Sequence, residues 1–260
     1  MNIPLLNAIS YLGIIESGVS RPIKCLCKNE ELQSEYAVKL KTKVNDGILS
    51  LCSEVIATKL ANALNIDTPD IAIINLSEEF ANLVEELEIS REILANVGIN
   101  FGSKLISGNT TWIRGQSITR SILQPAFETL MFDAMIQNPD RTLVKPNFLI
   151  NKNRIYLIDH EKGFSFVRDL FHKHSPWEVS KLSFLKNHIF YPELKKNNIA
   201  EYFDIMEDKL KVITEKEIEN IFLNIPEEWN NDHLIKIKNH LLEIFTNSNK
   251  FIQELKILLA

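Results

Sequence analysis

Residues 138–160, NPDRTLVKPNFLINKNRIYLIDH, contain the most informative pattern in the chain. Asp140 follows an Asn-Pro pair in a polar loop, and Asp159 ends an apolar run 19 residues later. Between them, a tight Asn-Lys-Asn turn separates two short apolar runs, residues 148–151 and 154–158, which predicts an antiparallel hairpin. Because a hairpin folds back on itself, both carboxylates can face one cleft.

Two acidic side chains in this order suit phosphoryl transfer. One carboxylate orients the attacking hydroxyl and accepts its proton, and the other holds Mg²⁺ on the phosphates. Magnesium takes one or two protein carboxylates together with water and phosphate oxygens, so one well-placed aspartate suffices. A simpler interpretation stays open at this point, with Asp140 serving local turn chemistry and Asp159 serving as a cap at the end of a strand.

Two residues upstream favour the functional interpretation. Lys39 interrupts an otherwise apolar strand, YAVKL, and Glu54 follows 15 residues later on a stretch with helical apolar spacing, residues 49–64. Protein kinases hold such a strand lysine on the ATP phosphates with a glutamate from the next helix. An exposed edge-strand lysine and a solvated glutamate are the alternatives, but the ordered set with both aspartates is harder to assemble by accident.

The remaining patterning predicts an α+β fold with segregated lobes rather than a βαβ alternation. The strand-rich lobe is expected over residues 1–107 and the helical lobe, with the embedded hairpin, over 108–260. The spacing of apolar residues and of turn and cap residues predicts strands at 9–16, 23–28, 36–40, 71–76 and 99–106, helices at 49–64 and 78–87 (with Ser77 as N-cap), a long helix with Pro125 in its first turn, and helices from about 177 onward.

Composition excludes several classes. The chain has 260 residues, 45% hydrophobic and 24% charged, as in ordinary globular proteins. A formal net charge of −5 argues against a general nucleic-acid binder. No apolar stretch reaches the roughly 20 residues of a membrane-spanning helix. The start of the chain lacks the pattern of a secretory signal, and the three cysteines (Cys25, Cys27 and Cys52) favour buried thiols over disulfides or a metal, so we expect a cytoplasmic protein.

The chain resembles the HipA-like kinase family, in particular its short stand-alone branch. The resemblance implies an atypical, two-lobed protein-kinase-like fold that binds ATP and Mg²⁺. The matching segments follow the family order and span residues 13–229; they are SGVSRP (17–22), YAVKL (36–40), SEVIATKLANALNIDTPDIAII (53–74), NFGSKLI (100–106), FDAMIQNPDRTLVKPNFLI (132–150), RIYLIDHEKGF (154–164) and IPEEW (225–229).

The resemblance implies a role for each matching residue in nucleotide binding. Lys39 would neutralise the ATP phosphates and Glu54 would position Lys39. Gly18, Ser20 and Arg21 would belong to the loop over the phosphates. This loop has only one glycine, fewer than kinase phosphate-binding loops usually have.

The resemblance also implies which residues take part in the chemical step. Asp140 would be the catalytic base and Asp159 the magnesium ligand. Arg141 would pair with a nearby carboxylate or with substrate phosphate, and backbone groups of residues 105–107 would contact adenine.

One departure from the family pattern affects the metal site. Kinases usually place an asparagine five residues after the catalytic aspartate, but that position is Lys145 here, and the nearest asparagine is Asn147. Three accounts remain open. Asn147 reaches the metal through a shifted loop; Lys145 replaces one ion with its own charge; or the protein binds nucleotide without transferring phosphate.

The leading hypothesis is an ATP- and Mg²⁺-dependent kinase that phosphorylates serine or threonine of a protein, with its own loops among the candidate acceptors. A catalytically impaired nucleotide-binding module and a small-molecule or lipid kinase are the alternatives. The amphipathic tail, residues 232–260, either packs on the helical lobe or binds a protein partner.

Overall fold

The computed structural model describes residues 3–16, 20–112, 119–169 and 174–260. Its strand-rich N-terminal region and helical C-terminal region agree with the α+β expectation. Contacts group the chain into two compact units: Met1–Val55 with Pro69–Ser107, and Ile56–Thr68 with Gly108–Ala260. The segment Ile56–Thr68, which the sequence division assigns to the first lobe, therefore groups with the second unit, and the helix α1 (Ile48–Ala63) contributes residues to both.

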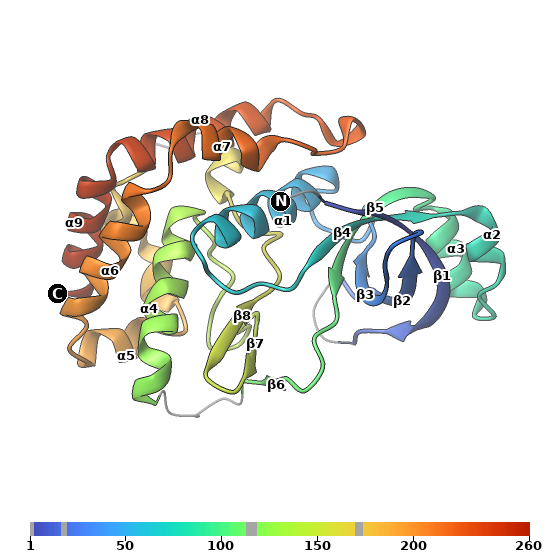
Figure 1. The fold of residues 1–260 in the computed structure, drawn as a ribbon, viewed down its shortest axis with the longest axis horizontal. Coiled ribbons are helices and arrows are strands. Elements are labelled where there is room, and N and C mark those ends of the chain that lie inside the picture. Colours follow the sequence, from blue (N-terminus) through green and yellow to red (C-terminus); the bar gives the residue numbers. More distant parts are fainter. Residues whose placement is uncertain (1–2, 17–19, 113–118, 170–173) are drawn as a thin grey trace. The chain divides into compact units, whose positions relative to one another are not determined.

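The first unit is built around a closed five-stranded barrel in the order β1-β2-β3-β5-β4 (Figure 1). Neighbouring strands are antiparallel except for β1 and β4, which are parallel and close the barrel. The strands are β1 (Leu5–Ile14), β2 (Ile23–Lys28), β3 (Gln33–Lys39), β4 (Ile71–Leu76) and β5 (Gly98–Lys104).

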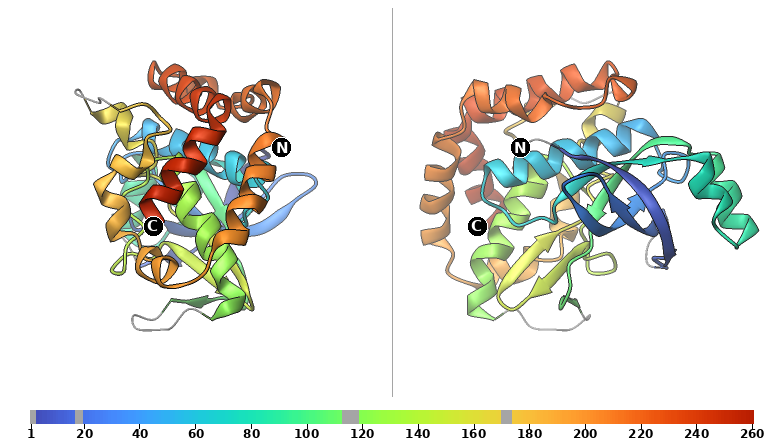
Figure 2. Two further views of the ribbon diagram at one scale, coloured as in Figure 1. Left: turned by 90° about the vertical axis from the view of Figure 1, so that its left-hand side faces the viewer. Right: turned by 45° about the vertical axis from the view of Figure 1, so that its right-hand side comes forward.

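Two short helices, α2 (Glu78–Asn82) and α3 (Leu87–Leu94), complete this unit beside the barrel (Figure 2). Ser77 caps α2, because its side chain accepts a hydrogen bond from the Phe80 N–H at 3.1 Å. Phe80 and Ile93 bring the helices into the hydrophobic core of the barrel. Cys25 and Cys27 are fully buried in the same core, as the alternation of β2 predicts, and burial raises the pKa of both thiols.

The second unit is a helical body with a small sheet, β6-β7-β8. The antiparallel hairpin of β7 and β8 confirms the predicted one almost residue for residue. The strands are β6 (Thr110–Thr111), β7 (Phe148–Asn151) and β8 (Arg154–Leu157); the helices are α4 (Arg120–Met135), α5 (Tyr191–Lys196), α6 (Ala200–Lys211), α7 (Glu215–Phe222), α8 (His233–Thr246) and α9 (Ser248–Leu259), with short 3₁₀ turns η1 (Ser165–Arg168), η2 (Val179–Lys181), η3 (Ser183–Asn187) and η4 (Glu227–Trp229).

The core of this unit surrounds α4, which is buried over most of its length. The ring of Phe127 packs edge-on against Phe203 of α6, with centroids 4.8 Å apart. From the tail, His240 of α8 contacts the carbonyl of Met135 at 2.9 Å. The apolar face of α8 and α9 is buried inside the unit, which supports the packing interpretation of the tail; its members include Ile237, Leu241, Ile244, Phe251, Ile252 and Leu255.

None of the helices in the described part of the chain is long and apolar enough to cross a membrane.

Candidate active site

In the first unit, Lys39 and Glu54 form a buried ion pair. Lys39 is the last residue of β3, and its Nζ lies 2.5 Å from Oε1 of Glu54 on α1. The side chains are only 9% and 3% exposed. Burying two charges is costly unless they neutralise each other, so this pair excludes the edge-strand and solvated-face alternatives and fixes the lysine ammonium at one place.

The connection between β1 and β2 is the segment expected to cover the phosphates. The N–H of Ile15 donates to the carbonyl of Pro22 at 2.8 Å, which closes the connection at its base. Gly18 lies outside the described residues. Ser20 is buried, and Arg21 is exposed, with its guanidinium 3.4 Å from the carboxylate of Glu16.

After β5, one of the backbone groups expected to contact adenine is already hydrogen-bonded. The Leu105 N–H already donates to the carbonyl of Glu35 at 2.9 Å, so this donor is not available to a base.

In the second unit, Asp140 lies in the loop that leaves α4. Its N–H donates to the side chain of Asn138 at 3.1 Å, which fixes the turn. Asn147 donates its Nδ2 to Oδ2 of Asp140 at 3.4 Å, and the Nζ of Lys145 lies 3.4 and 3.5 Å from the two carboxylate oxygens. The Asp140 side chain is 21% exposed, so this carboxylate, flanked by an amide and an ammonium, is still open to solvent.

A tight turn between Thr142 and Lys145 explains how Asn147 returns to Asp140. The Thr142 N–H donates to the carbonyl of Lys145 at 2.9 Å, and the Lys145 N–H donates to the Thr142 hydroxyl at 3.3 Å. The turn takes up the two additional residues of this loop, and Asn147 then adopts a positive φ of 51°. Of the three accounts of the departure at Lys145, this geometry favours the shifted loop.

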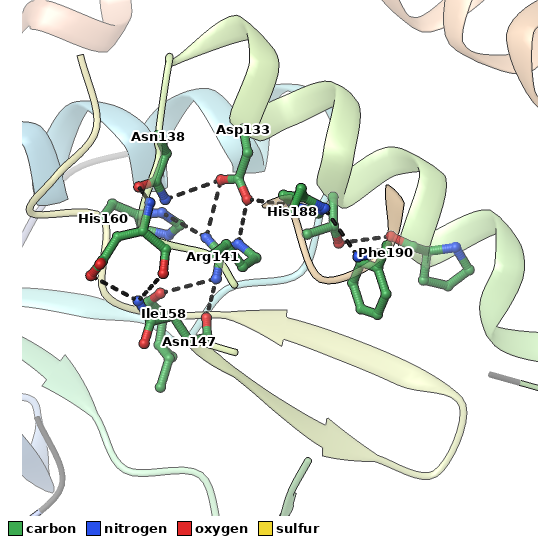
Figure 3. A network of polar contacts seen from close by, with 11 residues as sticks. Asp133, Asn138, Arg141, Asn147, Ile158, His160, His188 and Phe190 are labelled. Atoms are coloured by element: carbon green, nitrogen blue, oxygen red, sulfur yellow. Dashed lines mark hydrogen bonds and ion pairs between the residues drawn. The ribbon is translucent and has the colours of Figure 1, made fainter. Parts of the chain in front are cut away.

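Arg141 is at the centre of a buried network that holds the loop (Figure 3). Its guanidinium makes a two-point pair with Asp133 of α4, at 2.5 and 3.2 Å, and donates to the carbonyls of Asn147 and Ile158. Because both Arg141 and Asp133 are inaccessible to solvent, Arg141 pairs with a carboxylate rather than facing a substrate phosphate. It is a positioning residue.

His188 completes this network from a distant segment. Its Nδ1 accepts the N–H of Phe190 at 3.2 Å, so Nε2 must be the protonated nitrogen that donates to Asp133 at 3.0 Å. Burial lowers the pKa of His188 and keeps the ring neutral. Burial alone would raise the pKa of Asp133, but the charge of Arg141 and the hydrogen bonds from His188 and Arg141 outweigh it and hold this pKa at about 2.

Asp159 is held next to the Asn147 segment by the backbone. The N–H of Ile158, the residue before Asp159, donates to the carbonyl of Asn147 at 3.1 Å, and Arg141 bridges the carbonyls of the same two residues. Asp159 itself has a positive φ of 60°, which turns the chain sharply at the end of β8. The two candidate metal ligands therefore lie on adjoining backbone segments.

The chain after Asp159 is compact and leaves little room for a side chain at Gly163. The Gly163 N–H donates to the carbonyl of His160 at 2.8 Å, and an added Cβ at Gly163 would come within 3.0 Å of that carbonyl oxygen and 3.3 Å of Ile136. Arg168 donates to the carbonyls of Glu161 and Gly163, both at 3.3 Å. These contacts fix the segment that contains the candidate metal ligand.

The donor set suits magnesium rather than a metal held by protein alone. Among the residues that the structure describes, no group of three or more His, Cys, Asp or Glu side chains could hold a metal ion. Asn147 uses its amide nitrogen toward Asp140, which leaves its oxygen as an acceptor. One carboxylate and one amide oxygen are a normal protein contribution to Mg²⁺, which takes its other ligands from water and phosphates.

Sequence reasoning missed Asp133 and His188. Asp133 lies in the matching segment 132–150, but no role was assigned to it there, and His188 lies outside every matching segment; Asp133 contacts Arg141, 8 positions away in the chain, and His188, 55 positions away. The one available signal was an aspartate inside the apolar run of residues 130–136, LMFDAMI, because a buried charge requires a partner.

The fold agrees with that of a known kinase. A solved structure of a proinflammatory kinase of Helicobacter pylori, CtkA, matches with a TM-score of 0.56 and 12% sequence identity, over 96% of this chain and 98% of that one. At this identity the match shows a common fold. Comparison with curated protein sequences finds no match.

The family model of HipA-like kinases matches residues 9–254. The chain therefore belongs to the HipA-like kinase family, as its motifs indicate.

Proposed function

We propose that this protein is a kinase that transfers the γ-phosphate of ATP, with Mg²⁺, to a serine or threonine hydroxyl of a protein. Membership of the HipA-like kinase family supports the phosphotransferase class. The observation on which the detailed proposal rests is the cluster around Asp140. An accessible carboxylate contacts Asn147, and the backbone of Asn147 is bonded to the residue before Asp159.

Asp140 would act as the base. The acceptor oxygen forms a bond to the γ-phosphorus, the bond to the ADP oxygen breaks, and the hydroxyl proton passes to Asp140. The amide of Asn147 and the ammonium of Lys145, both within 3.5 Å of the carboxylate, restrict its orientation. Lys145 also adds positive charge where negative charge gathers during transfer.

Asp159 and the oxygen of Asn147 would hold the magnesium ion, which neutralises charge on the phosphate oxygens when it is bound. Lys39 would contact the other phosphates. Its burial and its pairing with Glu54 support this role, because the ion pair holds the ammonium in one place. Ser20, Arg21 and Gly18 would belong to the loop over the phosphates.

A second candidate function is nucleotide binding without transfer. The observation that favours it is the ion pair of Lys145 with Asp140, because an ammonium on the base competes with the acceptor proton. The exposed fractions of 45% and 21% argue against a permanent block, since exposed pairs of this kind are worth at most about 1 kcal/mol.

Nucleotide binding tests the phosphate-binding half of the proposal. ATP with Mg²⁺ should raise the melting temperature of the wild type, because a ligand that binds only the folded state stabilises it. Lys39→Met should lose most of this shift. Lys43→Met is a matched control, because Lys43 also pairs with a glutamate at 2.5 Å in the same unit but is 40% exposed. An undiminished shift in Lys39→Met would remove Lys39 from the nucleotide site.

A further inference from the structure

The turn between Thr142 and Lys145 exposes two branched apolar side chains close to the proposed base. Leu143 is 49% exposed and Val144 is 81% exposed. Single exposed apolar residues are common on protein surfaces. Here the two residues are adjacent, at the tip of a turn that starts two residues after Asp140. Any acceptor hydroxyl must reach the Asp140 carboxylate, so an acceptor passes close to this pair.

The base of this turn is fixed. Thr142 pairs with His188 in an isolated antiparallel bridge, and the Ile189 N–H donates to the carbonyl of Arg141 at 3.1 Å. His188 is anchored in turn on the buried Asp133. The hydrogen bond from Thr142 to Lys145 closes the turn itself. The turn that contains Leu143 and Val144 is therefore already ordered before a ligand binds. Binding a ligand there costs little conformational entropy of the backbone.

The chain length between Asp140 and Leu143 allows a polypeptide acceptor to contact both. Leu143 is three residues beyond Asp140, so their Cα atoms are at most about 11 Å apart. An extended peptide covers about 11 Å in three or four residues. A peptide whose hydroxyl reaches Asp140 can therefore place a side chain three or four positions away on Leu143 and Val144. A small-molecule acceptor needs no contact at this distance.

We propose that Leu143 and Val144 select protein acceptors that have an apolar side chain three or four residues from the phosphorylated serine or threonine. This inference rests on the proposed function and names the class of substrate for the same site. The contact would bury apolar surface from both partners, which favours leucine, isoleucine or valine at that position over serine or glycine.

The test compares two sets of serine and threonine peptides with labelled ATP and Mg²⁺. One set has leucine, isoleucine or valine three or four residues from the acceptor, and the other has serine or glycine there. We expect the wild type to prefer the first set by about tenfold in kcat/KM, the scale of one apolar contact. The double variant Leu143→Ser, Val144→Ser should reduce this ratio toward one. Ile235→Ser, Ile257→Ser replaces residues that are 65% and 62% exposed, and it should keep the wild-type ratio.

The outcomes separate the two proposals. Phosphorylation of both peptide sets at equal kcat/KM by the wild type, or an unchanged ratio in the Leu143/Val144 variant, would overturn this inference alone. Transfer of label to small molecules but to no peptide would overturn both this inference and the protein acceptor of the proposed function. A wild type that binds ATP and transfers no phosphate to any acceptor would overturn the proposed function, and this inference with it.

Discussion

Asn147 donates its side-chain amide to the carboxylate of Asp140 at 3.4 Å, although the two residues are seven positions apart in the chain. The closed turn from Thr142 to Lys145 makes this contact possible. A loop two residues longer than the usual kinase spacing thus still brings an asparagine to the aspartate. The proposed metal site can then form without an asparagine at position 145.

Asn147→Ala should lower phosphate transfer about 10- to 100-fold, because it removes both a proposed metal ligand and the amide that orients Asp140. The concentration of Mg²⁺ at half-maximal rate should rise, and a magnesium titration of initial rates measures both effects. Asn153→Ala, in the exposed turn between β7 and β8, is the control and should leave the titration unchanged. A variant at 147 with the wild-type magnesium dependence would mean that Asn147 is not a ligand.

Lys145→Asn restores the usual kinase residue and tests the remaining accounts of this position. Since Asn147 already contacts Asp140, we expect no gain in transfer and a loss of about tenfold or less from removing the positive charge. Initial rates at saturating ATP and Mg²⁺ measure the change. A clear increase in rate would instead show that Lys145 impairs the enzyme, in favour of the nucleotide-binding module.

Arg141→Met should destabilise the protein by about 3–5 kcal/mol, because it leaves the Asp133 carboxylate buried without its main counter-charge. Urea unfolding measures the free energy. Arg154→Met is a matched control, since Arg154 also pairs with a carboxylate, Asp67, but is 61% exposed, and its loss should cost less than about 1 kcal/mol. Equal losses in both variants would contradict the positioning role of Arg141.

Lys59 should make stability depend on pH in the alkaline range. This lysine of α1 is buried and donates to the carbonyls of Asn220 and Leu223, at 2.8 and 2.7 Å, at the C-terminal end of α7. Burial lowers the pKa of Lys59 from 10.5 to about 8. Between these values the unfolded chain binds the proton more strongly, so the free energy of unfolding should rise as the pH rises from about 8 to about 10.5.

The measurement compares this slope in the wild type, in Lys59→Met and in Lys236→Met, a change at an exposed lysine of α8. The free energy of unfolding should rise more steeply with pH in the wild type and in Lys236→Met than in Lys59→Met, and by the same amount in both. If Lys59→Met has the same slope as the wild type, burial does not lower the pKa of Lys59 in the folded protein.

Local patterns predicted elements whose signals are local. The apolar run after Thr68-Pro69 predicted β4, and a tight turn between two short runs predicted the β7–β8 hairpin. The serine before two glutamates predicted the cap of α2. The prediction that Pro125 lies in the first turn of the long helix was wrong. α4 begins at Arg120 and contains Pro125 in its interior, because burial of the helix outweighs the loss of one backbone hydrogen bond.

Features that depend on contacts distant in sequence could not be predicted. The parallel pairing of β1 with β4 closes the barrel, and no turn signal specifies it. The helix expected over residues 78–87 is α2, which already ends at Asn82, and a further helix, α3, begins at Leu87. At the site, the lysine–glutamate pair followed from motif order, whereas the network of Asp133, Arg141 and His188 exists only once the chain is folded.

The central claim is that Asp140 is the base of a phosphate transfer, and transfer of labelled γ-phosphate to proteins of a heat-treated lysate tests it most directly. Heat treatment inactivates endogenous kinases, so label reports this protein. The wild type and Asp208→Asn, which changes an 81% exposed carboxylate of α6, should label protein bands. Asp140→Asn should lose about 10²- to 10⁴-fold in transfer while ATP still raises its melting temperature. Label in Asp140→Asn equal to that in the wild type would contradict the claim.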